Sequence, residues 1–146
     1  MKLIREVVDD LIAQHKAREN LAEALQAHFH RPFELSTAKH DDLKNEVMQQ
    51  ALALLRQRED RIGAEVLREH GRLILLQTID DLWTEHLFNL ELVEESIGLR
   101  GFAELDPLVE WKKETARMWE ETLQLIRSRA VTLWFLVQTS PSAEAR

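Results

Sequence analysis

One short segment decides the fold of this chain: Gly98-Leu99-Arg100-Gly101-Phe102-Ala103-Glu104-Leu105-Asp106-Pro107. Gly98 and Gly101 give the backbone two flexible points, and we predict that Gly98 ends the helix before the segment. Asp106 can cap the next helix, and Pro107 can be its first residue, where its missing N–H costs nothing. A connection this short predicts an antiparallel pair of helices, so we expect a long helical hairpin over residues 73–137.

Both arms of this predicted hairpin carry apolar residues at a spacing of three to four. The first arm continues a pattern that starts near Asp41 and meets no proline before the turn. Gly63 and Gly71 interrupt that pattern, and each costs about 1 kcal/mol relative to alanine inside a helix, so either can mark a bend or a break. We therefore expect either one bent helix or two nearly collinear ones. The second arm runs from Pro107 until the pattern stops before Pro141.

Four tryptophans lie on the two arms: Trp83, Trp111, Trp119 and Trp134. At helical spacing on facing helices, such residues more often form a core than line a ligand groove. We predict that they form the hairpin core, with a ligand groove as the alternative.

The residues before the hairpin predict a small helical subdomain. A short amphipathic helix is expected near the start, with one apolar stripe made of Leu3, Ile4, Val7, Val8, Leu11 and Ile12. A second helix is expected from Asn20, whose side chain can cap it, to near Arg31, because Pro32 disfavours helix in the preceding residue. Ser36 or Thr37 can cap a third helix.

Composition agrees with an all-α fold. The 146 residues are 45% hydrophobic and 31% charged, with only four glycines and three prolines. This balance is typical of long helices around a real core. No stretch alternates apolar and polar residues for long enough to predict a strand.

Charge and residue usage exclude several classes of function. The chain has no cysteine, so it has no disulfide and no thiolate site. A net charge of −7 argues against nucleic-acid binding, which needs clustered Lys and Arg. The longest apolar run, residues 133–137, is far shorter than the roughly 20 residues of a membrane-spanning helix. Acidic residues also interrupt the amino-terminal apolar pattern, so we expect no signal peptide. The absence of cysteine is compatible with a reducing cytoplasm, where we expect this chain to work.

Polar clusters give no convincing catalytic or metal site. Asp81 and Glu85 share a helix face, but His86 points away from Glu85, so no paired-ligand motif arises. His28 and His30 lie two residues apart on a helix, hence on different faces, and we expect surface or partly buried positions for them. We predict no catalytic residue, no metal site and no cofactor.

Three motifs, in order, resemble one known family. They are Gln77-Thr78-Ile79-Asp80-Asp81-Leu82-Trp83-Thr84-Glu85-His86-Leu87, then residues 97–107 around Leu99-Arg100-Gly101-Phe102-Ala103, then Glu110-Trp111-Lys112-Lys113-Glu114. This pattern resembles the two-helix finger of the SecA family of protein-export motors. A weaker resemblance upstream is carried by residues 58–65 and by Ile4-Arg5-Glu6.

The resemblance implies a domain organisation. Residues 1–64 correspond to a helical wing-like subdomain, residues 65–138 to the two-helix finger of the helical scaffold, and residues 139–146 to a polar tail. The family's ATPase motor and its Cys/His metal-binding tail have no counterpart in this sequence. No Gly-x-x-x-x-Gly-Lys-Ser/Thr phosphate loop occurs, so we expect no ATP hydrolysis by this chain alone.

The resemblance also implies a contact site at the finger tip. In the family the tip enters the cytoplasmic mouth of a membrane channel and touches the translocating polypeptide through an aromatic residue. Phe102 is the matching residue here, within a contacting loop made of Leu99, Arg100, Gly101, Phe102, Ala103, Glu104 and Leu105. Glu104-Leu105 replaces the family's usual Gln-Lys, so this tip is more acidic than the family pattern.

Two functions remain open at this point. The first is an interaction module for protein export, with unfolded preprotein and the Sec channel or a separate motor as partners, at the inner face of the plasma membrane. The second is a free-standing helical scaffold or dimerisation protein, a homo-oligomer formed through an exposed apolar face of the hairpin.

Overall fold

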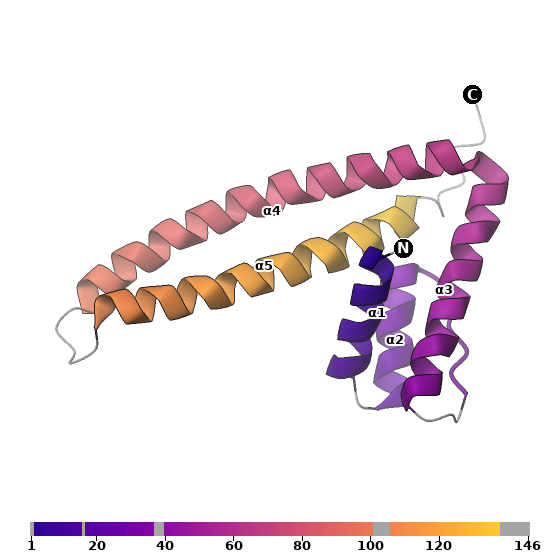
Figure 1. Ribbon diagram of the computed structural model, residues 1–146, viewed down its shortest axis with the longest axis horizontal. Helices are drawn as coiled ribbons and strands as arrows, with labels where there is room; N and C mark the ends of the chain where they lie inside the picture. Colours follow the sequence, from indigo (N-terminus) through magenta and orange to yellow (C-terminus); the bar gives the residue numbers. More distant parts are fainter. Residues whose placement is uncertain (1, 16, 37–39, 101–105, 138–146) are drawn as a thin grey trace. The chain divides into compact units, whose positions relative to one another are not determined.

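The computed structural model describes residues 2–15, 17–36, 40–100 and 106–137, and these residues form five helices and no strand. The all-α prediction is therefore confirmed. The helices are α1 (Lys2–Gln14), α2 (Arg18–Phe29), α3 (His40–Ile62), α4 (Ala64–Arg100) and α5 (Pro107–Val137) (Figure 1). None of them is long and apolar enough to cross a membrane.

The chain divides into two compact units. Unit 1 consists of Met1–Leu75 and Arg127–Arg146, and unit 2 consists of Leu76–Ile126. Both unit boundaries fall inside a helix, one in α4 and one in α5. The boundary between residues 64 and 65, expected from the family resemblance, stays a prediction.

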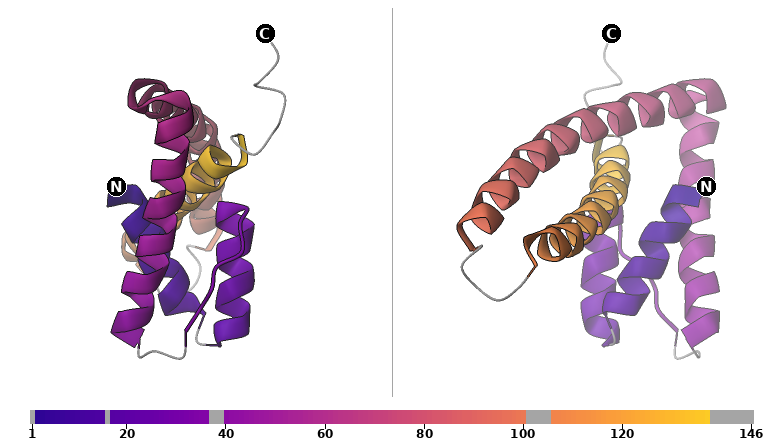
Figure 2. Two further views of the ribbon diagram at one scale, coloured as in Figure 1. Left: turned by 90° about the vertical axis from the view of Figure 1, so that its right-hand side faces the viewer. Right: turned by 60° about the vertical axis from the view of Figure 1, so that its left-hand side comes forward.

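Unit 1 is built on the apolar stripe of α1. Its buried residues are those that the sequence pattern predicts: Ile4, Val7, Val8, Leu11 and Ile12. Helices α2 and α3 both contact α1, and Figure 2 shows the three helices from two further sides. They add to one core cluster the residues Leu21, Leu25, Phe29, Leu43, Val47, Ala51 and Leu55.

The last turns of α5 complete this core. Val131 and Phe135 are fully buried within it, although they are distant in sequence from α1 and α2. The ring of Phe135 meets that of Phe29 edge-on at 4.8 Å, and Phe29 lies 5.1 Å from Phe33. Burying one phenylalanine contributes about 1.5–3 kcal/mol, so these turns of α5 are a substantial part of the fold of unit 1.

The ends of α2 differ in part from the prediction. The helix begins at Arg18, and its capping residue is Ala17, which is extended and provides no side-chain cap. The Asn20 cap is therefore wrong, and an acidic Glu19 in the first turn interacts favourably with the helix dipole instead. The helix ends at Phe29, close to the predicted Arg31, with His30 in the left-handed conformation.

Ser36, one of the two caps expected for α3, holds the connection before that helix, and its role as a cap stays a prediction. Its backbone N–H and its hydroxyl both donate to the carboxylate of Glu46, the hydroxyl at 2.8 Å. Gln50 holds the same connection one turn later, since its amide group both donates to Glu34 O, at 2.7 Å, and accepts from Glu34 N–H, at 3.0 Å. The alternative cap, Thr37, lies outside the described residues.

The long pattern from residue 41 onward breaks at Gly63. This glycine has φ of +85°, and α4 starts directly after it at a steep angle to α3 within unit 1 (Figure 1). The expected break at one of the two glycines is thus confirmed at Gly63. The nearly collinear course of the two helices is wrong, because a left-handed residue redirects the chain. Gly71 does not break α4. A Cβ at Gly71 would lie 3.1 Å from the indole of Trp134, so glycine allows that ring to approach closely.

Of the two helix ends predicted within residues 98–107, one is wrong and one is confirmed. Helix α4 runs through Gly98 to Arg100, so the prediction that Gly98 ends the helix is wrong. Helix α5 begins at Pro107 as predicted, and Asp106 caps it by accepting a hydrogen bond from Leu108 N–H at 3.0 Å. The antiparallel course of the two arms stays a prediction.

Candidate functional site

The predicted contact loop begins at the very end of α4. Leu99 and Arg100 are its last two helical residues, and the next described residue is the capping Asp106. Gly101, Phe102, Ala103, Glu104 and Leu105 lie outside the described residues. The assignment of residues 99–105 to polypeptide or channel contact therefore stays a prediction.

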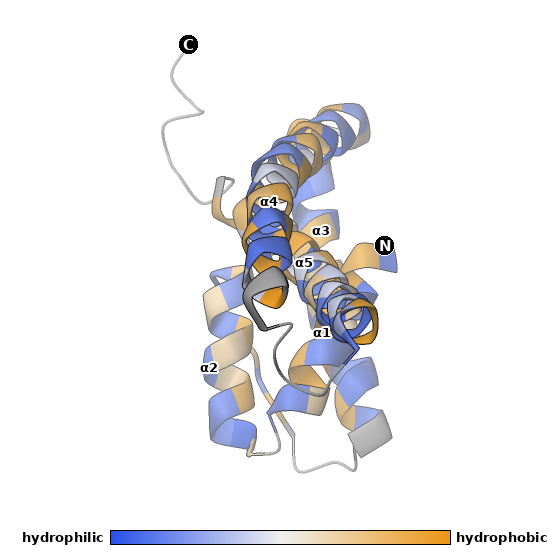
Figure 3. Ribbon diagram, turned by 90° about the vertical axis from the view of Figure 1, so that its left-hand side faces the viewer, coloured by the Kyte–Doolittle hydropathy of each residue, from blue (hydrophilic) through white to orange (hydrophobic). Residues whose placement is uncertain are grey.

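Unit 2 presents many apolar side chains at its surface. Hydrophobic and hydrophilic residues alternate along the ribbons of α4 and α5 (Figure 3), and among its described residues unit 2 has no third helix. Two helices alone offer little area in which to bury such residues. The large apolar residues left exposed here are Leu76, Ile79, Trp83, Leu87, Phe88, Leu92, Leu108, Val109, Trp111, Trp119 and Leu125.

The four tryptophans are distributed over both units. Trp83 and Trp119 meet edge-on at 6.0 Å in unit 2, and they stay 44% and 41% exposed. Trp111 also belongs to unit 2 and is 38% exposed, whereas Trp134 packs against the core of unit 1. Their assignment to a single hairpin core stays a prediction.

His86 is buried within unit 2, a position that was not predicted from the sequence. Its side chain is only 5% exposed, and its ring lies 5.6 Å from the rings of both Trp83 and Trp119. Nδ1 lies 3.0 Å from the hydroxyl of Thr122. The spacing of the apolar residues could have indicated this burial. His86 follows the apolar Leu82 by one turn on one arm, and Thr122 follows Met118 by one turn on the other.

The hydrogen bonds of Thr122 fix the tautomer of His86. The Thr122 hydroxyl donates its one hydrogen to Met118 O at 2.8 Å. It must therefore accept from His86, so that Nδ1 carries the proton. Neutral His86 then has an unprotonated Nε2, which is a hydrogen-bond acceptor.

A small cavity of about 160 Å³ adjoins this histidine within unit 2. Its polar lining includes Glu85, Asn89 and Glu121, and Glu121 accepts from Arg117 at 2.7 Å. The apolar part of the lining comes from Leu82, Met118 and Leu125. In the part of the chain that the structure describes, no three His, Cys, Asp or Glu side chains come together as a metal site.

Unit 2 also carries the negative charge of the chain. Residues 76–126 include twelve acidic and four basic side chains, a net charge of −8, against −7 for the whole chain. Unit 1 is therefore close to neutral. A surface that combines this charge with exposed apolar residues suits a basic and partly apolar partner.

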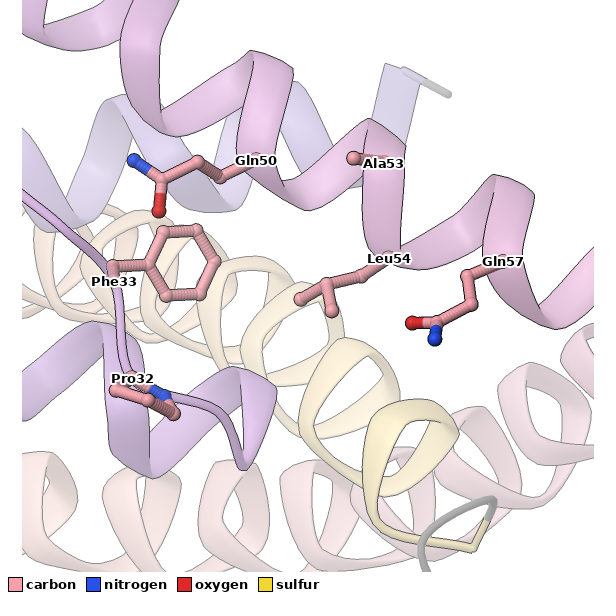
Figure 4. Close-up of a pocket in the computed structure, with 6 residues that line it drawn as sticks. All are labelled: Pro32, Phe33, Gln50, Ala53, Leu54 and Gln57. Atoms are coloured by element: carbon pink, nitrogen blue, oxygen red, sulfur yellow. The ribbon is translucent and has the colours of Figure 1, made fainter.

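A second, larger cavity lies in unit 1. It has a volume of about 430 Å³ and lies between the connection after α2 and one face of α3. Phe33 and Leu54 point into the same space in Figure 4, with the amides of Gln50 and Gln57 further along α3. Because Gln50 already holds Glu34, this cavity offers few free polar groups.

Two basic side chains, the half-buried His28 and the buried Arg58, join α5 to the rest of unit 1. His28, half-buried as expected, lies 2.9 Å from the hydroxyl of Thr132 and 3.3 Å from that of Ser128. Arg58 donates to Phe135 O at 3.0 Å and lies over the Phe135 ring at 4.3 Å. Burial, followed by the charges of Arg61 and Arg31, lowers the pKa of Arg58 to about 10.

Comparison with known proteins gives one consistent family. The family model described as SecA Wing and Scaffold domain matches residues 1–138. The chain is similar to the protein translocase subunit SecA of Thermodesulfovibrio yellowstonii, with 35% identity over 144 residues, 98% of this chain and 16% of that protein. The SecA subunit of Micrococcus luteus is 39% identical over 102 residues, 70% of this chain and 11% of that protein. The chain thus spans about one sixth or less of the length of these relatives.

Proposed function

Because this chain belongs to the SecA Wing and Scaffold family, we propose that it acts as an interaction module in protein export. In this role the segment 99–105 contacts a translocating polypeptide or the channel through which it passes. The chain works in the cytoplasm and reaches the inner face of the membrane when it engages the channel. The family match over residues 1–138, which includes this segment, is the observation that carries the proposal.

The helices beside the segment support this role. Helix α4 ends at Arg100 and α5 begins at Pro107 with its Asp106 cap, so six residues connect two helices of at least 31 residues. Phe102 is the second residue of that connection. An aromatic side chain there provides a flat apolar surface that suits many different side chains, as contact with an unfolded polypeptide requires.

The energy for movement comes from another polypeptide segment. The sequence contains no phosphate-binding loop of the Gly-x-x-x-x-Gly-Lys-Ser/Thr type. The module therefore transmits mechanical work and does not hydrolyse ATP itself. The partners in this proposal are an unfolded preprotein, the Sec channel and a motor.

A photo-crosslinking experiment tests the contact at residue 102. A photoreactive phenylalanine analogue replaces Phe102, and a control chain carries the same analogue at the exposed Arg68 of α4. We expect crosslinks to an unfolded secretory polypeptide from position 102 and none from position 68. We also expect Phe102→Ala to weaken binding of that polypeptide by about fivefold to tenfold, because a large apolar contact is lost.

Two results would contradict this role. One is equal crosslinking from both positions. The other is unchanged binding by Phe102→Ala in a chain whose circular dichroism shows the helix content of the unchanged protein.

The exposed apolar surface of unit 2 favours a second candidate, a scaffold that self-associates through this surface. Sedimentation velocity at several concentrations distinguishes the two functions. A stable dimer supports the scaffold, and a monomer that binds channel or polypeptide supports export. The net charge of −8 on residues 76–126 opposes contact between two copies of unit 2, which is why export is the leading proposal.

A further inference from the structure

The larger cavity of unit 1 has an apolar floor and one free amide. Gln50, Leu54 and Gln57 line it from one face of α3, and Phe33 points into the same space as Leu54 (Figure 4). Phe33 is buried, and Leu54 packs against the core of unit 1. Gln50 is bonded to Glu34, whereas Gln57 has no hydrogen bond in the described part of the chain. The cavity can therefore take an apolar group beside a polar one.

The last turn of α5 lies close to this cavity within unit 1. Arg58, which follows Leu54 by one turn on α3, donates to Phe135 O at 3.0 Å. The ring of Phe135 contacts that of Phe29, which in turn contacts Phe33 of the cavity wall. Two ring contacts therefore separate the end of α5 from the cavity.

Arg58 also has a donor that lacks an acceptor. The residue is 5% exposed, and its Nη1 is buried without a hydrogen-bond partner among the described residues. A buried donor of a charged group costs free energy until an acceptor reaches it. Because Nη2 of Arg58 holds the carbonyl of Phe135, a segment that starts at residue 138 can bring an acceptor to Nη1.

The segment after α5, residues 138–146, is long enough to reach the cavity. Pro141 is its fourth residue, and an extended chain spans about 3.3 Å per residue, so Pro141 can lie up to about 13 Å from Val137. Along the axis of α3, Leu54 is only about 6 Å from Arg58. The cavity thus lies within the range of Pro141.

The chemistry of this segment also suits the cavity. Pro141 disfavours a helical conformation of Ser140, so the segment can leave α5 as an extended chain. The main-chain groups of an extended chain have no partners of their own, and the amide of Gln57 can both donate to them and accept from them. Extended segments that contain proline bind in grooves lined by aromatic side chains, and Phe33 provides such a side chain here.

We propose that residues 138–146 dock on unit 1 along this face of α3. Pro141 occupies the apolar floor of the cavity, and main-chain carbonyls of the segment accept from Gln57 and from Nη1 of Arg58. Because the segment is attached to α5, its effective concentration at the cavity is on the order of millimolar, which favours it over a free peptide of the same kind. The site does not include residues 99–105, so its test is independent of the proposed function.

A nitroxide label tests the proposal in the whole chain. The sequence has no cysteine, so Ala143→Cys provides a single labelling position, two residues after Pro141. The unpaired electron of the label broadens the nuclear magnetic resonance signals of groups that lie near it. We expect the side-chain amide signals of Gln50 and Gln57 to lose most of their intensity, relative to the same chain with the label reduced.

Two exposed glutamines of α3 provide matched variants. Gln57→Ala removes the proposed hydrogen bonds, and Gln49→Ala changes a glutamine that does not line the cavity. We expect the ratio of docked to free segment, followed at the Gln50 amide, to fall about fivefold in Gln57→Ala and to stay unchanged in Gln49→Ala. Pro141→Ala should also lower this ratio, because the apolar contact of the ring is lost. Circular dichroism checks that each variant keeps its helix content.

Three results would overturn the proposal. The first is full intensity of the Gln50 and Gln57 amide signals in the labelled chain. The second is the same ratio of docked to free segment in Gln57→Ala as in Gln49→Ala. The third is equal broadening when the label and the observed amides are on different copies in a mixture, which would show that the segment of a second copy occupies the cavity.

Discussion

At the scale of single residues, His28 connects helices that are about one hundred residues apart in sequence. Thr132 donates its hydroxyl hydrogen to Ser128 O at 2.9 Å, so it accepts from His28 Nδ1. Nε2 of His28 is then the acceptor for the Ser128 hydroxyl at 3.3 Å. This arrangement uses both nitrogens of a neutral ring. A second proton on the ring would remove the hydrogen bond from Ser128.

This residue predicts a dependence of stability on pH. Burial, followed by the charges of His15 and His30, lowers the pKa of His28 below its usual 6.5. Below pH 6.5 the unfolded chain binds a proton that the folded chain resists, so acidification favours unfolding. We expect the free energy of unfolding to be constant with respect to this group above pH 6.5 and to fall below it, by at most about 1.4 kcal/mol per pH unit.

Urea titrations between pH 5 and pH 8 measure this effect. His28→Gln keeps a donor and an acceptor but cannot titrate, so the loss of stability on acidification should be smaller than in the unchanged chain. His70→Gln, at an exposed position of α4, should keep the dependence of the unchanged chain. An identical acid loss in His28→Gln and in the unchanged chain would contradict the assignment.

The positions of His28 and His86 show what the sequence could not predict at this scale. The partners of His28 lie 100 and 104 residues away, and the partner of His86 lies 36 residues away. Helical spacing identifies which face of a helix a residue occupies, but not which distant helix covers that face. The partial burial of His28 could be predicted, whereas its hydrogen bonds depend on tertiary packing.

At the scale of helices, the break between α3 and α4 depends on the backbone of one glycine. Gly63 N–H donates to Glu59 O at 2.8 Å, and Gly63 O accepts from Leu67 N–H at 3.1 Å. The residue thus ends one helix and starts the next. Its φ of +85° is strained for any residue with a Cβ, although no atom lies within 4 Å of the place that a Cβ would occupy.

Substitution at this position separates backbone strain from steric contact. Gly63→Ala should lower the free energy of unfolding by about 1–2 kcal/mol, because alanine resists the left-handed conformation. Gly63→Asn should cost less than half as much, since asparagine tolerates that conformation better. Urea denaturation of the three chains checks both values. Equal stability of the alanine variant and the unchanged chain would show that the break does not need a left-handed residue.

Helix ends were predictable only where a local interaction defines them. Asp106 and Pro107 begin α5 as expected because capping involves the next two or three residues alone. Gly98 and Gly71 were expected to disturb a helix, but each lies inside α4. A single glycine costs about 1 kcal/mol, which the packing of a long helix easily outweighs. At Gly71 the reason for glycine is the indole of Trp134, which sequence spacing does not reveal.

At the scale of the whole molecule, unit 1 is closed by residues from both ends of the described chain. The core formed by α1, α2 and α3 includes Val131 and Phe135 of α5, both fully buried. Arg127 also lies 3.8 Å from the carboxylate of Asp10 in α1. The composition of the chain predicted an all-α fold, but the participation of α5 in the first core was not predicted, because it requires the three-dimensional path of the chain.

A truncation tests this closure. A chain that ends at Ile126 should lose the cooperative unfolding of unit 1, because removal of Phe135 and Val131 leaves a cavity in its core. Removal of each large core side chain costs about 2–5 kcal/mol, comparable with the whole stability of a small domain. Differential scanning calorimetry and binding of a hydrophobic dye check this outcome. A truncated chain with an unchanged melting transition would contradict it.

The position of Phe135 in this core also has a consequence for biosynthesis. The ribosome produces α1, α2 and α3 first, and α2 ends at Phe29, about one hundred residues before Phe135. At roughly 5–20 residues per second, Phe29 of α2 waits about 5–20 s for the ring of Phe135 that packs against it. During that interval the nascent chain exposes hydrophobic surface to which cellular chaperones can bind. Unit 1 can therefore complete its folding only at the end of translation of this region.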